Sequence, residues 1–207
     1  MSEDYLSAME AKLPEYFGIL PKAKLVVKRG EAFREEAGGA QHYFPGTPDG
    51  ARPGVFYAHL SDMKAMPTYT LEAIAYHEGV PGHHMQISIA QELTGIPKFR
   101  TQYGYTAYQE GWGLYSEALA KDMGFYKDPY QRYGNLQARL FRAARLVVDT
   151  GIHAFGWPRD KAIAYMGQQG GVDRKEAAGC DLQQQTEHQR DLEPEARAEP
   201  AAEQVRE

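Results

Sequence analysis

The sequence predicts a mainly α (α+β) fold in which a helical core follows a small antiparallel sheet. Apolar residues recur at helical spacing after residue 70, whereas three short segments before it are rich in β-branched and aromatic residues. The chain has 207 residues, of which 43% are hydrophobic and 12% aromatic, so it is long enough to bury a core. From residue 167 onward Gln, Glu, Arg and Ala dominate. Residues 167–207 are therefore predicted to be a polar tail, disordered or loosely helical.

The elements before the core are a helix and three strands. Ser2–Phe17 is predicted to be a helix because apolar side chains recur there every four residues. The predicted strands of the antiparallel sheet are Lys24–Arg29, Gln41–Phe44 and Val55–Leu60. His42 and His59 lie on these strands, and we interpret both as ordinary strand residues rather than metal ligands.

The helical core follows in five segments. Glycine and proline residues near the segment ends are typical stop signals. The predicted helices are Thr70–Tyr76, His83–Leu93, Gly104–Met123, Tyr130–Phe155 and Asp160–Met166.

The eleven residues Tyr76–Gln86, which span the junction of the first two core helices, hold the densest group of reactive side chains. The segment reads Y-H-E-G-V-P-G-H-H-M-Q and contains His77, Glu78, His83 and His84. A His-Glu pair on a helix followed by another His is the zincin pattern. In that pattern two imidazoles bind Zn²⁺ and the Glu takes a proton from water. The sequence therefore predicts a zincin-like catalytic core.

The spacing departs from the usual H-E-x-x-H, because six residues rather than four separate His77 from His83. In a regular helix six residues turn a side chain by about 120° and raise it by about 9 Å, which keeps the two rings apart. Pro81 lacks a backbone donor and Gly82 admits unusual backbone angles. We therefore expect the helix to widen into a turn here and to resume at His83. A plain helix–turn–helix with surface histidines is the alternative.

A third ligand is expected on a following helix, since a catalytic zinc commonly has three protein ligands. Glu110 opens the segment E-G-W-G-L-Y-S-E, whose glycines would let two helices approach closely. Glu117, two turns later, is a candidate partner for a ligand histidine. Tyr115 is a candidate substrate or oxyanion contact. Both glutamates could instead be solvated helix carboxylates.

The longest predicted helix carries Arg145, Asp149 and His153 at spacings of four residues, so they share one face. His153 could donate a hydrogen bond to an oxyanion, with Asp149 or Arg145 orienting it or binding substrate. A surface ion pair beside a helix-end histidine is the alternative.

Composition excludes several classes. The net charge of −5 and the lack of a basic stripe argue against a nucleic-acid partner. No apolar run approaches the ~20 residues of a transmembrane segment, and the N-terminus has no apolar signal-peptide region. The single Cys180 excludes an internal disulfide and a cysteine-based zinc site.

Three motifs follow one another along the chain: H-E-G-V-P-G-H-H-M-Q, E-G-W-G-L-Y-S-E and R-L-V-V-D-T-G-I-H. Over about residues 17–166 the chain resembles the bacterial domain of unknown function 885 family. The resemblance implies a gluzincin-like zinc metallopeptidase in which His77, His83 and Glu110 bind Zn²⁺ and Glu78 is the base. It favours His83 over His84, because the residue after P-G-H can be aromatic in the family.

Members of that family are much longer and begin with a large helical region. The I-P-G-Q-x-L-x-Y-type segment expected after Met166 is also missing here. We therefore expect residues 1–166 to be a partial zinc-metallopeptidase-like domain, truncated or frame-shifted, with a missing N-terminal helical region as a partner. Members are often exported, and the compartment of this chain is left open.

The predicted function is hydrolysis of an amide bond in a peptide substrate, with Zn²⁺ as cofactor. Glu78 would take the proton from water and pass it to the leaving amine. The strand Val55–Leu60 is expected to be an edge that pairs with an extended substrate. One alternative is a non-catalytic, metal-binding remnant of such an enzyme. The other is a non-haem iron enzyme with a 2-His-1-carboxylate site, although that site commonly sits on a β-barrel.

Overall fold

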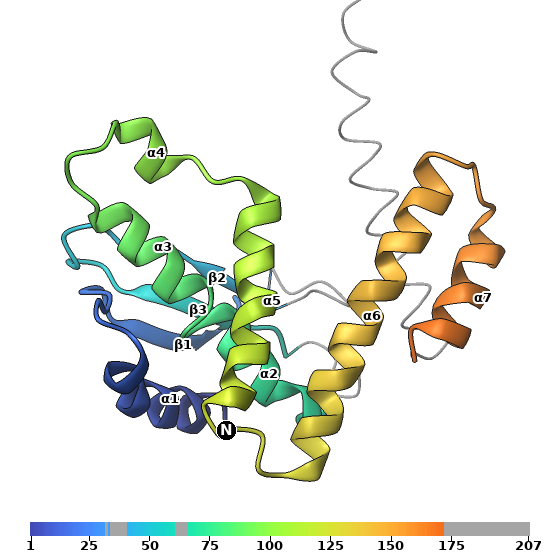
Figure 1. Ribbon diagram of the computed structural model, residues 1–207, viewed down its shortest axis with the longest axis horizontal. Helices are drawn as coiled ribbons and strands as arrows, with labels where there is room; N and C mark the ends of the chain where they lie inside the picture. The colour runs from blue at the N-terminus through green and yellow to red at the C-terminus, as the bar shows by residue number, and fades with distance from the viewer. Residues whose placement is uncertain (32, 34–40, 61–65, 172–207) are drawn as a thin grey trace, which may run out of the picture. The chain divides into compact units, whose positions relative to one another are not determined.

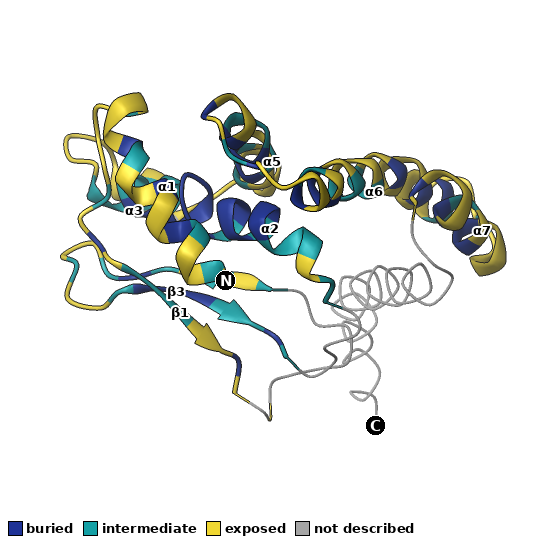
Figure 2. Ribbon diagram, turned by 90° about the horizontal axis from the view of Figure 1, so that it is seen from below, coloured by how far each residue is buried: buried dark blue, intermediate teal, exposed yellow. Residues whose placement is uncertain are grey.

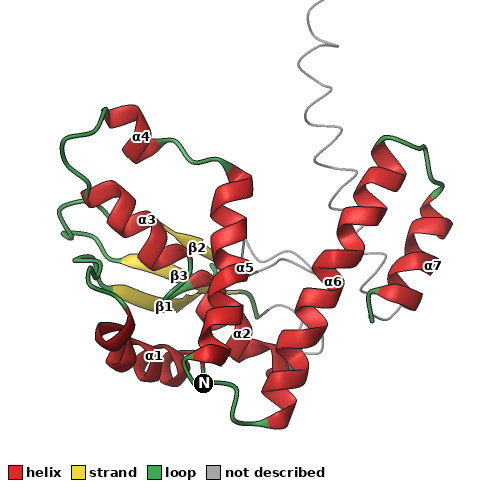
Figure 3. Cartoon of the chain, viewed as in Figure 1, coloured by secondary structure: helices red, strands yellow, loops and turns green. Residues whose placement is uncertain are grey.

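The computed structural model describes residues 1–31, 33, 41–60 and 66–171. The chain divides into two compact units, 1–139 and 140–207, which we describe separately. Figures 1 and 3 show the elements in chain order. The bounds are α1 Ser2–Tyr16, β1 Leu25–Arg29, β2 His42–Phe44, β3 Gly54–Ala58, the 3₁₀ turn η1 Thr68–Thr70, α2 Leu71–Glu78, α3 His83–Glu92, α4 Lys98–Gln102, α5 Thr106–Asp122, α6 Pro129–His153 and α7 Arg159–Gln169.

The three predicted strands form, but the sheet is mixed rather than antiparallel. The strand order is β1-β3-β2, with β3 parallel to β1 and antiparallel to β2. Successive strands reverse direction, so a sequential order would have been antiparallel throughout. The third strand instead inserts between the first two and thereby runs parallel to β1. It is also the most buried strand, which explains its central place.

The prediction that Val55–Leu60 is a substrate-pairing edge is wrong for the same reason. Both sides of β3 are hydrogen-bonded to neighbouring strands, so no free backbone remains there for a peptide. Within the described sheet, β1 and β2 are the edges.

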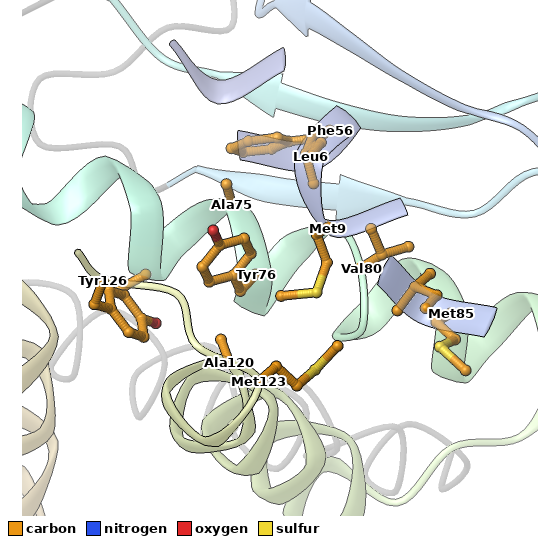
Figure 4. Packing of buried hydrophobic residues seen from close by; sticks show 12 residues of the cluster. Leu6, Met9, Phe56, Ala75, Tyr76, Val80, Met85, Ala120, Met123 and Tyr126 are labelled. Carbon is orange, nitrogen blue, oxygen red and sulfur yellow. The ribbon is translucent and has the colours of Figure 1, made fainter. Parts of the chain in front are cut away.

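Helices of the first unit cover one face of the sheet (Figure 2). The core consists of buried side chains from α1, α2, α5 and the central strand, and the α2 residues Ala75 and Tyr76 lie between Phe56 and Ala120 (Figure 4). Met9, Phe56 and Tyr76 are each fully buried and come from α1, β3 and α2 respectively. Burying such large side chains contributes about 1.5–3 kcal/mol each. This core fixes α2 on the sheet and therefore fixes the residues at the end of α2.

The interruption of the metal-segment helix is confirmed. α2 ends at Glu78 and α3 begins at His83, with a four-residue turn between them. The turn is closed by a hydrogen bond from the His84 N–H to the Gly79 carbonyl at 3.1 Å. The short helix α4 was not predicted, because five residues carry too little periodicity to reveal a helix.

The described part of the second unit comprises the end of α6 and the helix α7. Ala144 and Val148 of α6 pack against Ile163 and Met166 of α7. α7 runs to Gln169, three residues beyond the predicted end, because the glycine at 167 is tolerated inside the helix. The predicted polar tail lies outside the described residues from 172 onward. None of the helices in the described ranges is long and apolar enough to span a membrane.

Candidate metal centre

Two histidines meet across the break between α2 and α3. His77 is the second-last residue of α2 and His83 is the first of α3. Their ring centroids lie 4.6 Å apart at an interplanar angle of 82°. A Cβ at position 82 would collide with the carbonyl oxygen of His77, so only glycine lets the turn close so tightly. The turn thus compensates for the two additional residues between the histidines.

Glu110 completes the cluster from α5. Its carboxylate oxygens lie 3.4 Å from His77 Nε2 and 3.6 Å from His83 Nε2. The three ligand atoms all lie within 4.8 Å of one another. Across the described ranges, no other group of three or more His, Cys, Asp or Glu side chains is arranged to hold a metal ion. Hydrogen bonds with the two imidazoles hold the pKa of the Glu110 carboxyl well below its usual range, so the group is an anion.

A hydrogen-bond acceptor stands behind each histidine. Glu117 Oε1 lies 2.7 Å from His77 Nδ1, and the Glu117 side chain is 1% exposed. Gln86 Oε1 lies 3.4 Å from His83 Nδ1. An acceptor at Nδ1 can hold the ring proton there when a metal takes Nε2 in place of the contact with Glu110. Both Nε2 atoms face Glu110, so the donor set fits a divalent cation.

The helix α5 approaches the turn closely, as its glycines predicted. A Cβ at Gly113 would lie 2.5 Å from Cε1 of the His77 ring. Trp112 Nε1 donates a hydrogen bond to the Pro81 carbonyl at 2.8 Å. The absence of a side chain at position 113 therefore makes room for the imidazole, and the indole ties α5 to the turn.

Glu78, the predicted base, is half-buried at the end of α2 beside the cluster. Burial raises the pKa of its carboxyl, an effect opposed by the nearby His77 and His83. The backbone of Tyr43, on the edge strand β2, also hydrogen-bonds to this carboxylate. A carboxyl group whose pKa is raised toward neutrality is suited to take up and release a proton.

His84 points the other way, toward the sheet. Its Nδ1 lies 3.0 Å from the Tyr43 hydroxyl and its Nε2 lies 3.0 Å from the Ala23 carbonyl. The side chain is 2% exposed, and burial lowers its pKa to about 4. His84 thus holds α3 on the sheet and does not join the cluster.

The remaining candidate residues make contacts within their own units. Tyr115 is half-exposed and packs against Trp112, about 140° around α5 from Glu110. In the second unit, His153 Nε2 lies 3.6 Å from Asp149 Oδ1, one helical turn apart. Arg145 lies over the Phe141 ring, 5.9 Å from its centroid. The roles given to these three α6 residues remain predictions.

His42 on β2 and His59, the residue after β3, form a separate pair. His59 Nε2 lies 3.1 Å from His42 Nδ1, and the His42 ring stacks on Tyr57. In the described part of the chain neither residue belongs to a group of three or more metal-ligating side chains.

Sequence reasoning missed Gln86, Trp112 and Tyr43. Gln86 could have been found, because it follows His83 by three residues and so faces it on a helix. The contact of Tyr43 with His84 spans 41 residues and depends on the strand order, which periodicity does not reveal.

Fold and site together describe a mainly helical domain with a small mixed sheet and a His-His-Glu cluster that could hold a metal ion. Residues 1–180 match the family described as "Bacterial protein of unknown function (DUF885)". The chain belongs to this family. No curated protein matches it.

Solved structures similar to the chain include two bacterial proteins. One is described as "the putative lipoprotein from Colwellia psychrerythraea", with 39% sequence identity over 86% of this chain and a TM-score of 0.81. The other is described as "a putative lipoprotein of unknown function from Shewanella oneidensis", with 23% identity, 86% coverage and a TM-score of 0.60, and shows likeness of fold alone. The chain spans 30% and 35% of the lengths of these proteins.

Proposed function

We propose that the chain carries the metal site of a zinc-dependent hydrolase that cleaves peptide bonds. The observation that carries this proposal is the convergence of His77, His83 and Glu110 within 4.8 Å, with Glu78 adjoining His77. Two imidazoles and one glutamate form a ligand set of catalytic zinc enzymes, in which the fourth position is left to water or substrate.

Zinc is favoured over iron by the surroundings of the cluster. The same two-His, one-carboxylate set holds iron in oxygenases, where geometry and supporting fold distinguish the metals. Here the cluster lies on helices, and the described sheet has three strands. We therefore assign zinc rather than iron to this site.

The chemistry follows from the positions of the protein groups. A bound zinc ion supplies a Lewis acid that polarises the scissile carbonyl and lowers the pKa of water to about 7. Glu78 takes the proton from the attacking water and delivers it to the leaving amine. Glu117 and Gln86 keep the imidazoles oriented throughout. His153 is proposed to donate a hydrogen bond to the oxyanion.

A peptide substrate is supported by the edge strand β2. Its Tyr43 backbone hydrogen-bonds to Glu78, so the free edge of the sheet runs past the proposed base. An extended peptide that paired with this edge would pass its scissile bond beside Glu78. We expect a peptide ligand to lose affinity when the backbone nitrogens that face the edge are methylated.

The test is hydrolysis of a quenched fluorescent peptide library by the zinc-loaded chain. We expect cleavage by the wild type and a loss of about 10²–10⁴ in rate for Glu78→Gln, because a general base contributes that much. Glu15→Gln on the exposed surface of α1 is the matched control and should retain full activity. Glu78→Gln should still bind zinc. Cleavage that survives this substitution would contradict the assigned base.

The second candidate is a non-catalytic, metal-binding remnant of such an enzyme. The His-His-Glu cluster supports it equally, because holding a metal ion needs no substrate cleft. Stoichiometric zinc in a folded chain that cleaves no library peptide would establish the remnant and reject the hydrolase.

A further inference from the structure

Gln86 connects α3 and α5, two of the helices that carry the metal-ligand candidates. It lies on α3, one turn after His83, and is half-buried. Its Oε1 atom is 3.4 Å from His83 Nδ1, and its Nε2 atom donates a hydrogen bond to the Tyr108 carbonyl at 3.4 Å. Tyr108 belongs to the first turn of α5, two residues before Glu110.

The Tyr108 carbonyl decides which way the Gln86 amide is turned. A backbone carbonyl only accepts hydrogen bonds, so the amide NH₂ group must face it. The amide oxygen is thereby directed at His83 Nδ1. Because that oxygen also only accepts, it pairs with a ring proton on Nδ1. The Glu110 carboxylate, 3.6 Å from Nε2, competes for that proton in the metal-free chain, and a metal bound at Nε2 would remove the competition.

We propose that Gln86 is a positioning residue that sets the tautomer of His83 and ties it to the helix that carries Glu110. This inference rests on the proposed metal site. Gln86 would orient the His83 ring through Nδ1 as Glu117 orients the His77 ring, but with a neutral instead of a charged side chain. Glu117 is a carboxylate 2.7 Å from its imidazole, whereas Gln86 is a neutral amide at 3.4 Å.

A neutral side chain at position 86 limits the negative charge near the two histidines. Glu78, Glu110 and Glu117 already bring three carboxyl groups to the neighbourhood of the two histidines. An amide at position 86 orients the second imidazole without adding a fourth. It also supplies an N–H donor for the Tyr108 carbonyl, which a carboxylate lacks.

Two substitutions separate orientation of the imidazole from simple tethering of the helices. Gln86→Met keeps the length of the side chain but removes both hydrogen bonds. Gln86→Glu keeps the acceptor for His83 and loses the donor to Tyr108. Gln91→Met, on the same helix, is the matched control.

The first measurement is ¹⁵N NMR of the histidine side chains in the metal-free full chain carrying Glu110→Ala, which removes the competing acceptor at Nε2. In this background we expect the Nδ1–H tautomer for His83 with Gln86 intact, with Gln86→Glu and with Gln91→Met, and a mixture of tautomers with Gln86→Met. An unchanged tautomer in Gln86→Met would overturn the proposal, whether or not the chain binds zinc.

The second measurement is zinc affinity by competition with a chromophoric chelator. Gln86→Met should bind zinc about 10-fold more weakly, as is usual when a partner behind a ligand is lost, whereas Gln86→Glu should retain at least wild-type affinity. If both variants lost affinity equally, Gln86 would be a tether rather than a positioning residue, and the proposal would fall. A wild-type chain that binds no zinc would instead reject the proposed metal site, and the tautomer would still decide the role of Gln86.

Discussion

His83 and His84 are neighbours in the sequence but face different sides of α3, about 100° apart around the helix. His83 has an acceptor at Nδ1 and directs Nε2 toward Glu110, whose side chain is 58% exposed. His84 has partners at both nitrogens and is sealed between Tyr43 and Ala23 on the sheet side. The comparison teaches that a histidine becomes a candidate ligand when one nitrogen is bonded behind it and the other faces an open carboxylate. The same side chain with both nitrogens bonded serves to hold the fold together.

Gly113→Ala should cause the largest loss of zinc affinity at the His-His-Glu cluster. The added methyl would lie 2.5 Å from the His77 ring, which Glu117 holds in place, so the ring or α5 must shift. We expect zinc affinity to fall by about 100-fold, the upper end of the range for disturbed outer partners. Isothermal titration of zinc into the metal-free chain measures this.

Gly111→Ala is the control on the same helix. A Cβ at Gly111 meets nothing within 4 Å, so this variant should bind zinc as the wild type does. It should also be slightly more stable, since alanine is the better helix former by about 1 kcal/mol. Equal zinc affinity in both glycine variants would contradict the close approach of α5 to His77.

His84, on the sheet side of α3, should affect the pH dependence of stability rather than zinc binding. Burial lowers the pKa of folded His84 to about 4, whereas the unfolded side chain titrates near its ordinary value. Between these values the unfolded chain binds a proton that the folded chain does not, so stability is full above about pH 6.5 and declines as pH falls toward 4. The free energy of unfolding should fall by up to about 3 kcal/mol over this interval.

Urea unfolding of the metal-free chain at several pH values between 7 and 4.5 measures that decline. His84→Gln keeps groups that can bond to Tyr43 and Ala23 but cannot titrate, so its stability should depend less on pH. His42→Gln, on the exposed edge strand, is the control and should retain the wild-type dependence. An undiminished decline in His84→Gln would show that another group causes it.

Glu117→Gln should cause the smallest loss of zinc affinity. The amide can still accept a hydrogen bond from His77 Nδ1 but carries no charge, so orientation is retained and ligand basicity is reduced. Zinc affinity should fall by about 10-fold, with Asp122→Asn at the end of α5 as the neutralised control. Wild-type affinity in Glu117→Gln would indicate that the charge of Glu117 does not act on the site.

Much of the candidate site could be predicted from the sequence because its signals are local. Pro81 and Gly82 indicated where the helix breaks, and the glycines after Glu110 indicated the close approach of α5. The choice between His83 and His84 was not local. It depends on which face of α3 meets the sheet, and the spacing alone left it open.

The sheet topology could not be predicted from the sequence for a related reason. Composition identified all three strands, but the order β1-β3-β2 depends on the most apolar strand taking the centre. That order overturned two predictions together: that the sheet is antiparallel throughout and that the third strand is an edge. It also placed Tyr43 beside both Glu78 and His84, contacts for which periodicity gives no signal.

The measurement that tests the central claim most directly is metal content by elemental analysis of the purified folded chain. Wild type, His83→Ala and His84→Gln would be prepared identically. We expect about one zinc ion per chain in the wild type and in His84→Gln, and a loss of zinc in His83→Ala, as for a single three-ligand site. A folded wild-type chain without stoichiometric metal, or a loss of zinc caused by His84→Gln rather than His83→Ala, would contradict the account.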